Sequence, residues 1–322
     1  MKDKRVLITT YQSAFLRPGG GEAELKNLVD VLHQMGINAD IYGATSMRIE
    51  AYDIVLHFSV HGESFEFIKS IKAMGKKVIL WPNLWWAKMP DNNSVLYVES
   101  FLRLADVVIF KSLSELNNVS KYVHLTEIDH LIVPWHIDKN FLLPVSSDLF
   151  RRIYGLNEYL LWVGVIEASK NQYNAIQALN GVGIPLVFIG YHRDNAYFQL
   201  CRQSASAETL FLPYMEQGSE VLRSAYKGCT AYIELSSDPA GLSALEAALY
   251  EKPMILGKND WSEEEFGDTV ALVDVFNFED IKQVTGDAIN GKYQFRDKNK
   301  IIKKHLMPES LDLLVSLIHG IN

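Results

Sequence analysis

The sequence predicts an α/β protein with two Rossmann-like domains, each built on a doubly wound parallel sheet. Two observations carry the prediction. Short apolar runs alternate with stretches whose apolar residues recur every three or four positions, the pattern of parallel strands joined by helices. The chain has 322 residues, a length that suits two domains of ordinary size. We expect the first domain to span residues 1–140 and the second residues 141–322.

The composition excludes several classes of protein. Hydrophobic residues make up 48% of the chain and charged residues 22%, which is a globular balance. The formal net charge of −8 argues against nucleic acid as the main partner. No run of about 18 apolar residues occurs, and the first apolar run is too short for a signal peptide. Cys201 and Cys229 lack metal-ligand spacing, which indicates a reduced, cytoplasmic protein.

The first half of the chain should form one of the two sheets. Its apolar runs predict strands at Arg5–Thr10, Asn38–Tyr42, Asp53–Phe58, Lys77–Trp81 and Asp106–Phe110. Helical spacing between these runs predicts helices over residues 22–35, 64–74 and 94–104. The loop Gly19–Gly21 precedes the first helix without the G-x-G-x-x-G spacing of a dinucleotide-binding loop, so a flexible turn remains the alternative.

Two features near the strand ends of this half are candidates for ligand contact. His61 follows the third strand, at the edge where open α/β sheets bind ligands, although a lone histidine is more often structural. Three of the six tryptophans, Trp81, Trp85 and Trp86, fall within six residues after the fourth strand. Tryptophan at a rim can stack on a sugar or lie at a membrane interface. The alternative is a loop folded onto the core.

The second half repeats the alternation. Its apolar runs predict strands at Leu160–Gly164, Pro185–Gly190, Thr209–Leu212, Thr230–Leu235, Met254–Leu256 and Thr269–Val273. Helical patterns lie between them and continue to the end of the chain, over residues 194–206, 217–227, 241–250, 278–289, 296–306 and 308–318. The second half should therefore form the second parallel sheet.

The stretch from Tyr232 to Gly257 carries the strongest chemical signal. A strand leads into a polar turn, and a helix then begins with Gly241, Leu242 and Ser243. Free N–H groups and the helix dipole at such a start favour a diphosphate. Glu246, about one turn further in, could accept hydrogen bonds from paired ribose hydroxyls. An ordinary N-cap turn and amphipathic helix is the alternative.

These residues resemble the acidic motif of retaining GT-B glycosyltransferases of family 4, P-S-x-x-E-G-F-G-x-x-x-L-E-A-M-A-x-G-x-P-V-I. Asp238 and Glu246 stand at its two acidic positions, and Leu245–Ala247 with Pro253–Ile255 match its second half. Lys170 and Asn171 match the family frame V-G-R-L-x-x-x-K-N after Gly164, but Val165 replaces the arginine. In that family two such domains face a cleft, and the final helix, here about residues 308–319, packs back on the first domain.

Further segments resemble the same family. Residues 105–112 are similar to A-D-x-V-I-x-x-S, with Lys111 before the serine. Residues 131–138 are similar to its linker V-I-P-N-G-V-D, with Trp135 and His136 in place of Asn–Gly, which marks the domain boundary.

The resemblance implies roles for individual residues. Glu246 binds the ribose, the Gly241–Ser243 backbone binds the diphosphate and Asp238 lies near the donor sugar. Lys170 assists the leaving diphosphate, either alone or with another cation such as Arg193. His61 joins Asp238 and Lys170 as a candidate catalytic residue. The remaining residues implied or suggested as ligand contacts are Gly164, Asn171 and Tyr214 on the donor side, and Gly20, Gly21, Glu22, Trp85 and Trp86 on the acceptor side.

We therefore expect a retaining hexosyltransferase that moves a sugar from a nucleotide diphosphate-sugar to a glycan or lipid-linked acceptor in bacterial surface polysaccharide or glycoconjugate synthesis. No Asp-x-Asp metal motif occurs, so we expect neither a metal nor another cofactor. Peripheral contact with the inner face of the membrane stays open. Two alternatives remain: a related GT-B enzyme such as an epimerase or phosphorylase, and a non-catalytic partner subunit, which Val165 and Asp238 favour.

Overall fold

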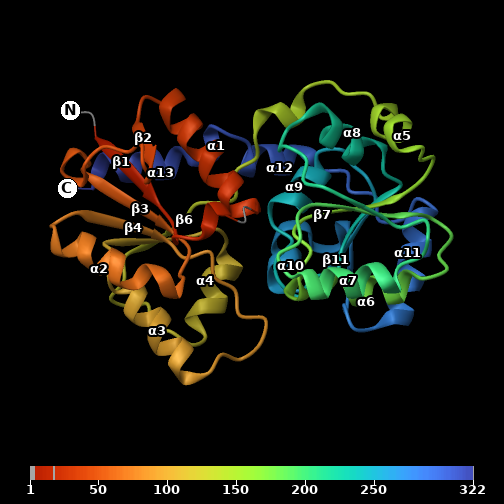
Figure 1. Ribbon diagram of the computed structural model, residues 1–322, viewed down its shortest axis with the longest axis horizontal. Coiled ribbons are helices and arrows are strands. Elements are labelled where there is room, and N and C mark those ends of the chain that lie inside the picture. The colour runs from red at the N-terminus through yellow and green to blue at the C-terminus, as the bar shows by residue number, and fades with distance from the viewer. Residues whose placement is uncertain (1–3, 17–18, 322) are drawn as a thin grey trace. The chain divides into compact units, whose positions relative to one another are not determined.

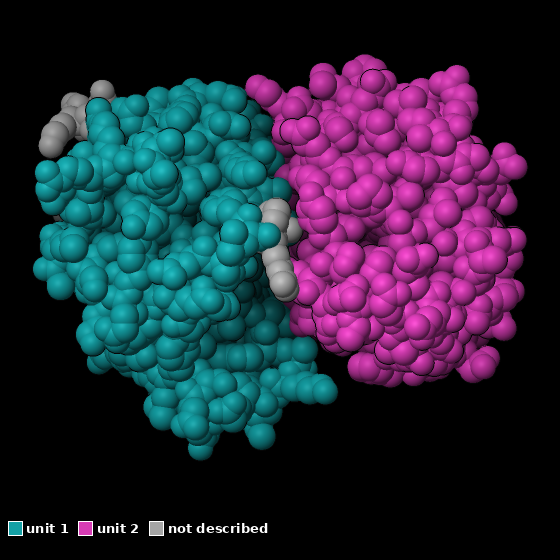
Figure 2. Space-filling view, in the orientation of Figure 1, with its two compact units in different colours: residues 1–136, 307–322 teal, residues 137–306 magenta. Residues whose placement is uncertain are grey.

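The computed structural model describes residues 4–16 and 19–321. The chain divides into two compact units, which are coloured separately in Figure 2. The first comprises Met1–His136 together with Met307–Asn322, and the second comprises Ile137–Leu306. The second unit is thus one continuous segment, whereas the first is completed by the last residues of the chain.

The first unit is built on a parallel sheet of six strands in the order β2-β1-β3-β4-β5-β6 (Figure 1). The strands are β1 (Arg5–Thr9), β2 (Asn38–Ile41), β3 (Ile54–Phe58), β4 (Lys77–Trp81), β5 (Val107–Phe110) and β6 (His130–Ile132). Helices cover both faces of this sheet, which explains why its central strands are continuous apolar runs rather than alternating ones.

Alternate residues of β1 show how the helices divide between the two faces. Val6 and Ile8 pack with α1 (Gly20–Gln34) and α13 (Asp312–Gly320). Leu7 points the other way, into a cluster formed with α2 (Phe65–Ala73), α3 (Asn92–Leu102) and α4 (Leu113–Ser120). The last helix of the chain therefore belongs to the core of the first unit.

The structure corrects two local expectations for this unit. The boundary between the units falls after His136, inside the linker expected at residues 131–138, but the first two residues of that segment, Leu131 and Ile132, belong to the edge strand β6. The glycine loop expected before the first helix is also shorter than its sequence suggests. Gly20 and Gly21 already belong to the first turn of α1, which Gly19 caps in an extended conformation.

The second unit repeats the architecture with the strand order β12-β11-β10-β7-β8-β9, again all parallel. Its strands are β7 (Leu160–Val163), β8 (Leu186–Ile189), β9 (Leu210–Leu212), β10 (Ala231–Glu234), β11 (Met254–Gly257) and β12 (Ala271–Val273). Its helices are α5 (Asp148–Tyr154), α6 (Gln172–Leu179), α7 (Asn195–Ser204), α8 (Glu220–Gly228), α9 (Leu242–Ala248), α10 (Asp260–Phe266), α11 (Phe278–Ile289) and α12 (Lys298–His305).

The two faces of this second sheet differ in chemistry. On one face, α6, α7 and α11 bury an apolar cluster that includes Ile233 of β10. Tyr232, the preceding residue, points to the other face and contacts the ring of Tyr226 on α8. None of the helices in residues 4–16 and 19–321 is both long and apolar enough to cross a membrane.

Candidate functional site

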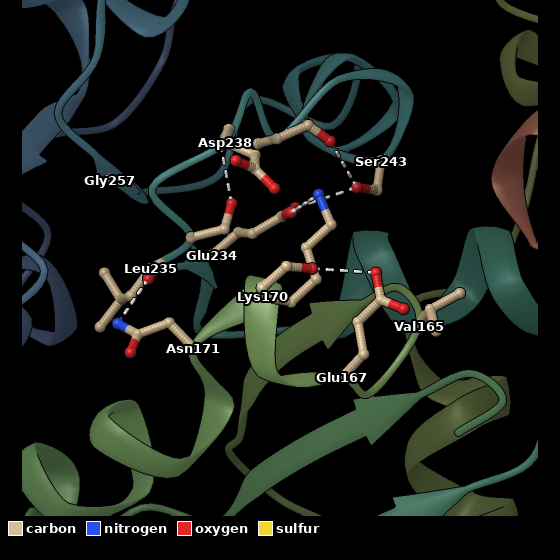
Figure 3. Close-up of polar contacts among 12 residues, drawn as sticks. Val165, Glu167, Lys170, Asn171, Glu234, Leu235, Asp238, Ser243 and Gly257 are labelled. Atoms are coloured by element: carbon tan, nitrogen blue, oxygen red, sulfur yellow. Dashed lines mark hydrogen bonds and ion pairs between the residues drawn. The ribbon is translucent and has the colours of Figure 1, made fainter. Parts of the chain in front are cut away.

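The candidate site lies at the carboxyl edge of the second sheet, between β7 and β10. These two strands pair with each other, but the chain leaves β7 toward β8 and β9 and returns on the other side to form β10. Such a point, where the strand order reverses, is where open α/β sheets bind their ligands. The loops after β7 and β10 approach each other there (Figure 3).

Two glycines allow the backbones of this edge to come close. A Cβ atom on Gly190, just after β8, would lie 2.0 Å from the carbonyl oxygen of Gly164, just after β7. A Cβ atom on Gly257 would lie 2.1 Å from the carbonyl oxygen of Ser236, just after β10. No side chain fits at either position, so larger residues would push the site loops apart. At the predicted donor-site residue Gly164 it is the backbone carbonyl that Gly190 approaches, and a Cβ atom on Gly164 would meet only the Trp162 indole nitrogen at 3.9 Å.

Lys170 is the cation of the site. It ends a short 3₁₀ turn, Ala168–Lys170, and Asn171 then caps α6. The Lys170 ammonium lies 4.0 Å from a carboxylate oxygen of Glu234, and the Lys170 side chain is 24% exposed (Figure 3). The lysine therefore reaches toward the buried edge of the sheet while part of its side chain stays in contact with solvent.

The sequence analysis missed Glu234, which is the last residue of β10. Its carboxylate is buried and accepts hydrogen bonds from the hydroxyls of Tyr232 (2.7 Å) and Ser243 (3.0 Å). Burial raises the pKa of Glu234, while Lys170 and the two hydroxyls oppose that rise. One sequence signal points to Glu234: it is an acid inside an apolar run. A buried acid predicts a paired partner, because acids are almost never fully buried unless they are paired.

Asp238, the predicted first acid of the motif, lies in the loop between β10 and α9 and is half-buried. Burial raises the pKa of the Asp238 carboxyl, Lys170 opposes this effect and Glu167 reinforces it. The carbonyl oxygen of Asp238 accepts hydrogen bonds from the side chains of Ser236 (2.9 Å) and Asn259 (3.4 Å). The loop is thus held by its backbone, which leaves the carboxyl group on the Lys170 side.

The structure contains the predicted helix start at Gly241–Ser243, whose binding of a diphosphate stays a prediction. Gly241 caps α9 with φ 66°, a conformation that favours glycine, and Leu242 and Ser243 follow as the first helical residues. The Ser243 hydroxyl lies 3.0 Å from Glu234 and 3.2 Å from the carbonyl oxygen of Ala240. Ser243 therefore faces Glu234 rather than the outside of the helix.

Glu246, the predicted ribose ligand, is buried on α9. One carboxylate oxygen accepts a hydrogen bond from Gln217 (2.6 Å) and the other from the hydroxyl of Tyr226 (2.8 Å). Burial raises the pKa of Glu246 to about 7. Both oxygens are held by protein donors, although a carboxylate oxygen has a second lone pair for a ligand hydroxyl. Its role in ribose binding stays a prediction.

The remaining predicted donor-side residues lie around this centre. The Asn171 amide donates to the carbonyl oxygens of Leu235 (3.0 Å) and Val275 (3.3 Å), so it ties strand ends together. A guanidinium nitrogen of Arg193 lies 3.5 Å from Glu167. Tyr214 is 39% exposed and its ring stacks on that of Tyr191 with centroids 5.2 Å apart.

In the first unit, the structure brings two predicted site residues, His61 and Glu22, together around Tyr11. The ring of exposed His61 stacks on the Tyr11 ring with centroids 4.4 Å apart. The Tyr11 hydroxyl donates to Glu22 at 3.1 Å, and the other Glu22 oxygen accepts from the Gly19 amide at 2.6 Å. Gly21 packs so closely on Phe58 that a Cβ atom would lie 2.9 Å from its ring.

The tryptophan segment folds onto the unit that carries it. Trp86 exchanges backbone hydrogen bonds with the Asn118 side chain, and its ring meets the edge of Tyr122. Trp81 is fully buried, whereas Trp85 is half-buried. The alternative of a loop packed on the core therefore describes Trp81 and Trp86, and Trp85 keeps a partly accessible ring.

A second buried ion pair, which the sequence did not predict, lies at the carboxyl edge of the first sheet. The Lys111 ammonium is 2.6 Å from Glu24, and both side chains are almost fully buried. Three rings, those of Phe58, Trp81 and Trp135, lie within 4.9–5.6 Å of the ammonium. Lys111 and Trp135 are two of the departures from the family pattern, and the structure shows that they meet.

Neither a protein-family model nor a curated protein matches the sequence. Solved structures do match its fold. A sucrose-phosphate synthase from Thermosynechococcus elongatus has a TM-score of 0.78 at 13% identity, covering 98% of both chains. The chain has the GT-B fold.

Two further structures extend this match. The Anabaena HepE protein in complex with UDP and glucose has a TM-score of 0.73 at 14% identity, covering 98% of this chain and 99% of that one. A UDP-forming α,α-trehalose-phosphate synthase from Burkholderia xenovorans, in complex with glucose-6-phosphate, has a TM-score of 0.72 at 11% identity, covering 98% and 100%. At these identities the likeness establishes the fold of this chain.

Proposed function

We propose that the protein is a glycosyltransferase that transfers a sugar from a nucleotide diphosphate-sugar to a glycan or lipid-linked acceptor, with retention at the anomeric carbon. The observation that carries the proposal is the convergence of Lys170, Ser243 and Asp238 at the strand-order reversal of the second sheet. A cation, a helix start and an acid at one strand edge suit a sugar diphosphate. Matched structures that contain UDP and sugars support the same class of ligand.

In this proposal the second unit binds the donor. Lys170 and the Gly241–Ser243 amides stabilise the charge that develops on the diphosphate as the bond between it and the anomeric carbon breaks. The acceptor hydroxyl attacks that carbon from the same face, and its proton passes to the departing phosphate oxygen. Asp238 orients the donor-sugar hydroxyls, and Glu246 holds the ribose.

The other predicted residues take secondary roles. Tyr214 lies beside the nucleobase, Arg193 adds positive charge, and Gly164 and Asn171 shape the donor loop. We assign the acceptor to the first unit, with His61, Glu22 and Trp85 as its contacts. Membership of glycosyltransferase family 4, a role in bacterial surface polysaccharide or glycoconjugate synthesis, independence of metal and a cytoplasmic location at the inner membrane face belong to the same proposal.

A thermal-shift screen tests the proposal. UDP, GDP, ADP and their glucose conjugates are added to the protein, first without metal and then with Mg²⁺. A ligand that binds only the folded state stabilises it by about 2.7 kcal/mol at a hundredfold excess over its Kd. We expect one nucleotide series to raise the melting temperature without metal. If no member of any series does so, the proposed donor site is wrong.

A non-catalytic partner subunit is the second candidate. Two observations favour it: Val165 stands where the resembled family has arginine, and both oxygens of Glu246 are already held by protein donors. Slow hydrolysis of the bound nucleotide sugar separates the candidates, because an enzyme should release free sugar over hours whereas a non-catalytic partner should not. The Lys170→Ala variant serves as the background control for contaminating hydrolases.

A further inference from the structure

One carboxylate lies against both side chains that are proposed to face the diphosphate. Glu234 accepts a hydrogen bond from Ser243 at 3.0 Å through one oxygen, and its other oxygen lies 4.0 Å from the Lys170 ammonium (Figure 3). The site therefore already contains a negative group in contact with its cation and its hydroxyl. An incoming diphosphate has to compete with that group for the same two partners.

We propose that Glu234 is a resident counter-ion of the donor site, which the diphosphate of a nucleotide sugar replaces at Lys170 and Ser243 while Glu234 takes up a proton. This inference rests on the proposed function, because it concerns how the same site accepts its donor. It makes Glu234 a positioning residue that sets the state of Lys170 before the ligand arrives. The only covalent change is a proton transfer: an O–H bond of solvent or buffer acid breaks, and the O–H bond of a neutral carboxyl group forms.

Glu234 cannot simply move away when the ligand arrives. It ends β10, whose backbone pairs with β7 and with β11, and its side chain is 3% exposed. Its hydrogen bond from the Tyr232 hydroxyl, at 2.7 Å, comes from the same strand. A diphosphate bound at Lys170 would therefore lie beside a fixed, buried carboxylate. The negative charges of the diphosphate and of Glu234 would repel each other strongly in this low-dielectric setting. We therefore expect the carboxylate to become neutral by taking up a proton.

The groups around Glu234 also favour proton uptake once a diphosphate has replaced it at Lys170. Lys170, on the turn before α6, is the cation facing Glu234, and the half-buried carboxyl of Asp238 also faces Lys170. The other titratable or polar groups that act on this centre come from β10, α8, α9 and the loops, namely Tyr232, Tyr226, Ser243, Glu246, Ser236 and Glu167. Burial already raises the pKa of Glu234, which makes proton uptake easier than in an exposed carboxylate.

Isothermal titration calorimetry tests the inference on the 322-residue protein with UDP-glucose, GDP-glucose and ADP-glucose. Nucleotide sugars are used because their diphosphate diester does not titrate near neutral pH. Each titration is run in two non-phosphate buffers with different enthalpies of ionisation, and the difference gives the number of protons taken up. We expect net uptake near pH 7 and a Kd that rises with pH, by at most about tenfold per pH unit for one proton.

Two variants assign the proton. Glu234→Gln keeps an oxygen that can accept from Tyr232 and Ser243 but cannot ionise, so uptake should disappear and Kd should become independent of pH. Asp238→Asn removes the neighbouring carboxyl and retains Glu234, so uptake should persist. Uptake that survives in Glu234→Gln, or is lost in Asp238→Asn, overturns the assignment to Glu234.

The pH series on the unmodified protein keeps the test decisive even if Glu234→Gln fails to fold. Glu246→Gln is titrated alongside, because ionisation of Glu246 on ribose binding would release a proton near pH 7 and mask uptake by Glu234. Binding without proton uptake and with a constant Kd in both proteins overturns the inference and leaves the proposed function intact. Absence of binding by all three nucleotide sugars overturns the proposed function itself. The two failures are therefore distinguishable in one set of titrations.

Discussion

Each of the two sheets carries a lysine–glutamate pair at its carboxyl edge, and the two pairs differ in accessibility. In the first unit, Lys111 and Glu24 are 2.6 Å apart and both side chains are at most 5% exposed. In the second unit, Lys170 and Glu234 are 4.0 Å apart, with 24% of the lysine side chain exposed. The lysine–glutamate pair is therefore shielded from solvent in the first unit (the closed pair) and partly exposed in the second (the open pair).

The surroundings of the two cations explain this difference. Lys111 is enclosed by the rings of Phe58, Trp81 and Trp135, which fill the ligand-binding edge of the first sheet with side chains. Lys170 faces the carboxylate of Glu234, which also accepts from the Ser243 hydroxyl, and the carboxyl group of Asp238; these groups can exchange partners with a ligand. We infer that the first pair serves stability and that the second serves binding, although each lies at the carboxyl edge of a parallel sheet.

The largest effect should come from breaking the closed pair. Lys111→Met leaves Glu24 buried without its partner, and loss of one member of a buried pair costs about 3–5 kcal/mol. Urea denaturation followed by circular dichroism should show this loss of unfolding free energy. Lys77→Met is the matched control, because Lys77 is 42% exposed and lies 3.7 Å from an aspartate that Lys72 also binds. Equal losses of unfolding free energy in Lys111→Met and Lys77→Met would contradict a special stabilising role for the closed pair.

Breaking the partly exposed pair, Lys170 and Glu234, should lower activity much more than stability. Lys170→Ala should lower turnover about 100-fold, equivalent to about 3 kcal/mol, because it removes a charge that stabilises the leaving diphosphate. Its unfolding free energy should change by about 1 kcal/mol or less, since the lysine is partly solvated and Glu234 keeps its two hydroxyl donors. Donor turnover and urea denaturation are measured on the same preparation.

Lys292→Ala is the control for that variant, since Lys292 pairs with Asp287 on the surface, away from the site residues. It should keep full turnover. A Lys170→Ala protein that turns over normally but unfolds easily would make Lys170 a stability residue like Lys111 and remove the distinction between the two pairs.

The pH dependence of stability tests a third buried acid, Glu246 on α9. The pKa of Glu246 is about 7 in the folded protein, above the ordinary value of 4.5, so the folded state holds a proton that the unfolded state releases. Stability contributed by this group is present below about pH 4.5 and is lost as pH rises toward 7. The shift corresponds to a loss on the order of 3 kcal/mol across that window.

Glu246→Gln removes this titration and can still bond Gln217 and Tyr226 through its amide. Denaturation at several pH values should therefore show the variant gaining stability relative to the unmodified protein between pH 4.5 and 7. A constant difference across that range would mean that Glu246 is ionised throughout, as a carboxylate ready for ribose hydroxyls would be.

The sequence predicts the architecture well because parallel strands buried on both faces leave long apolar runs. Runs such as Lys77–Trp81 and Leu160–Val163 need no tertiary information to be recognised. The edge strand β6, His130–Ile132, escapes because its residues were assigned to the linker that the family resemblance implies. Length alone is not the reason, since the edge strands β9 and β12 are equally short and were predicted.

The site is only partly predictable, and the reason is again physical. Lys170 and Ser243 were found because local motifs surround them, whereas the partner that connects them, Glu234, lies in a strand and is defined by contacts across the fold. Lys111 and Glu24 are 87 positions apart, so their pairing has no local signature at all. Motifs locate loop residues, and tertiary contacts decide which charges meet.

The smallest expected effects separate the two neighbouring tryptophans of the first unit. Trp86→Ala removes a ring that packs on Tyr122 and should cost about 1–3 kcal/mol of unfolding free energy, less than a fully buried aromatic residue. Trp85→Ala should leave stability within about 1 kcal/mol and raise the acceptor concentration needed for half-maximal rate, if its accessible ring stacks on the acceptor sugar. Denaturation and acceptor titration of both variants check this. Equal acceptor dependence in Trp85→Ala and the unmodified protein would remove Trp85 from the acceptor site and leave His61 and Glu22 as its predicted contacts.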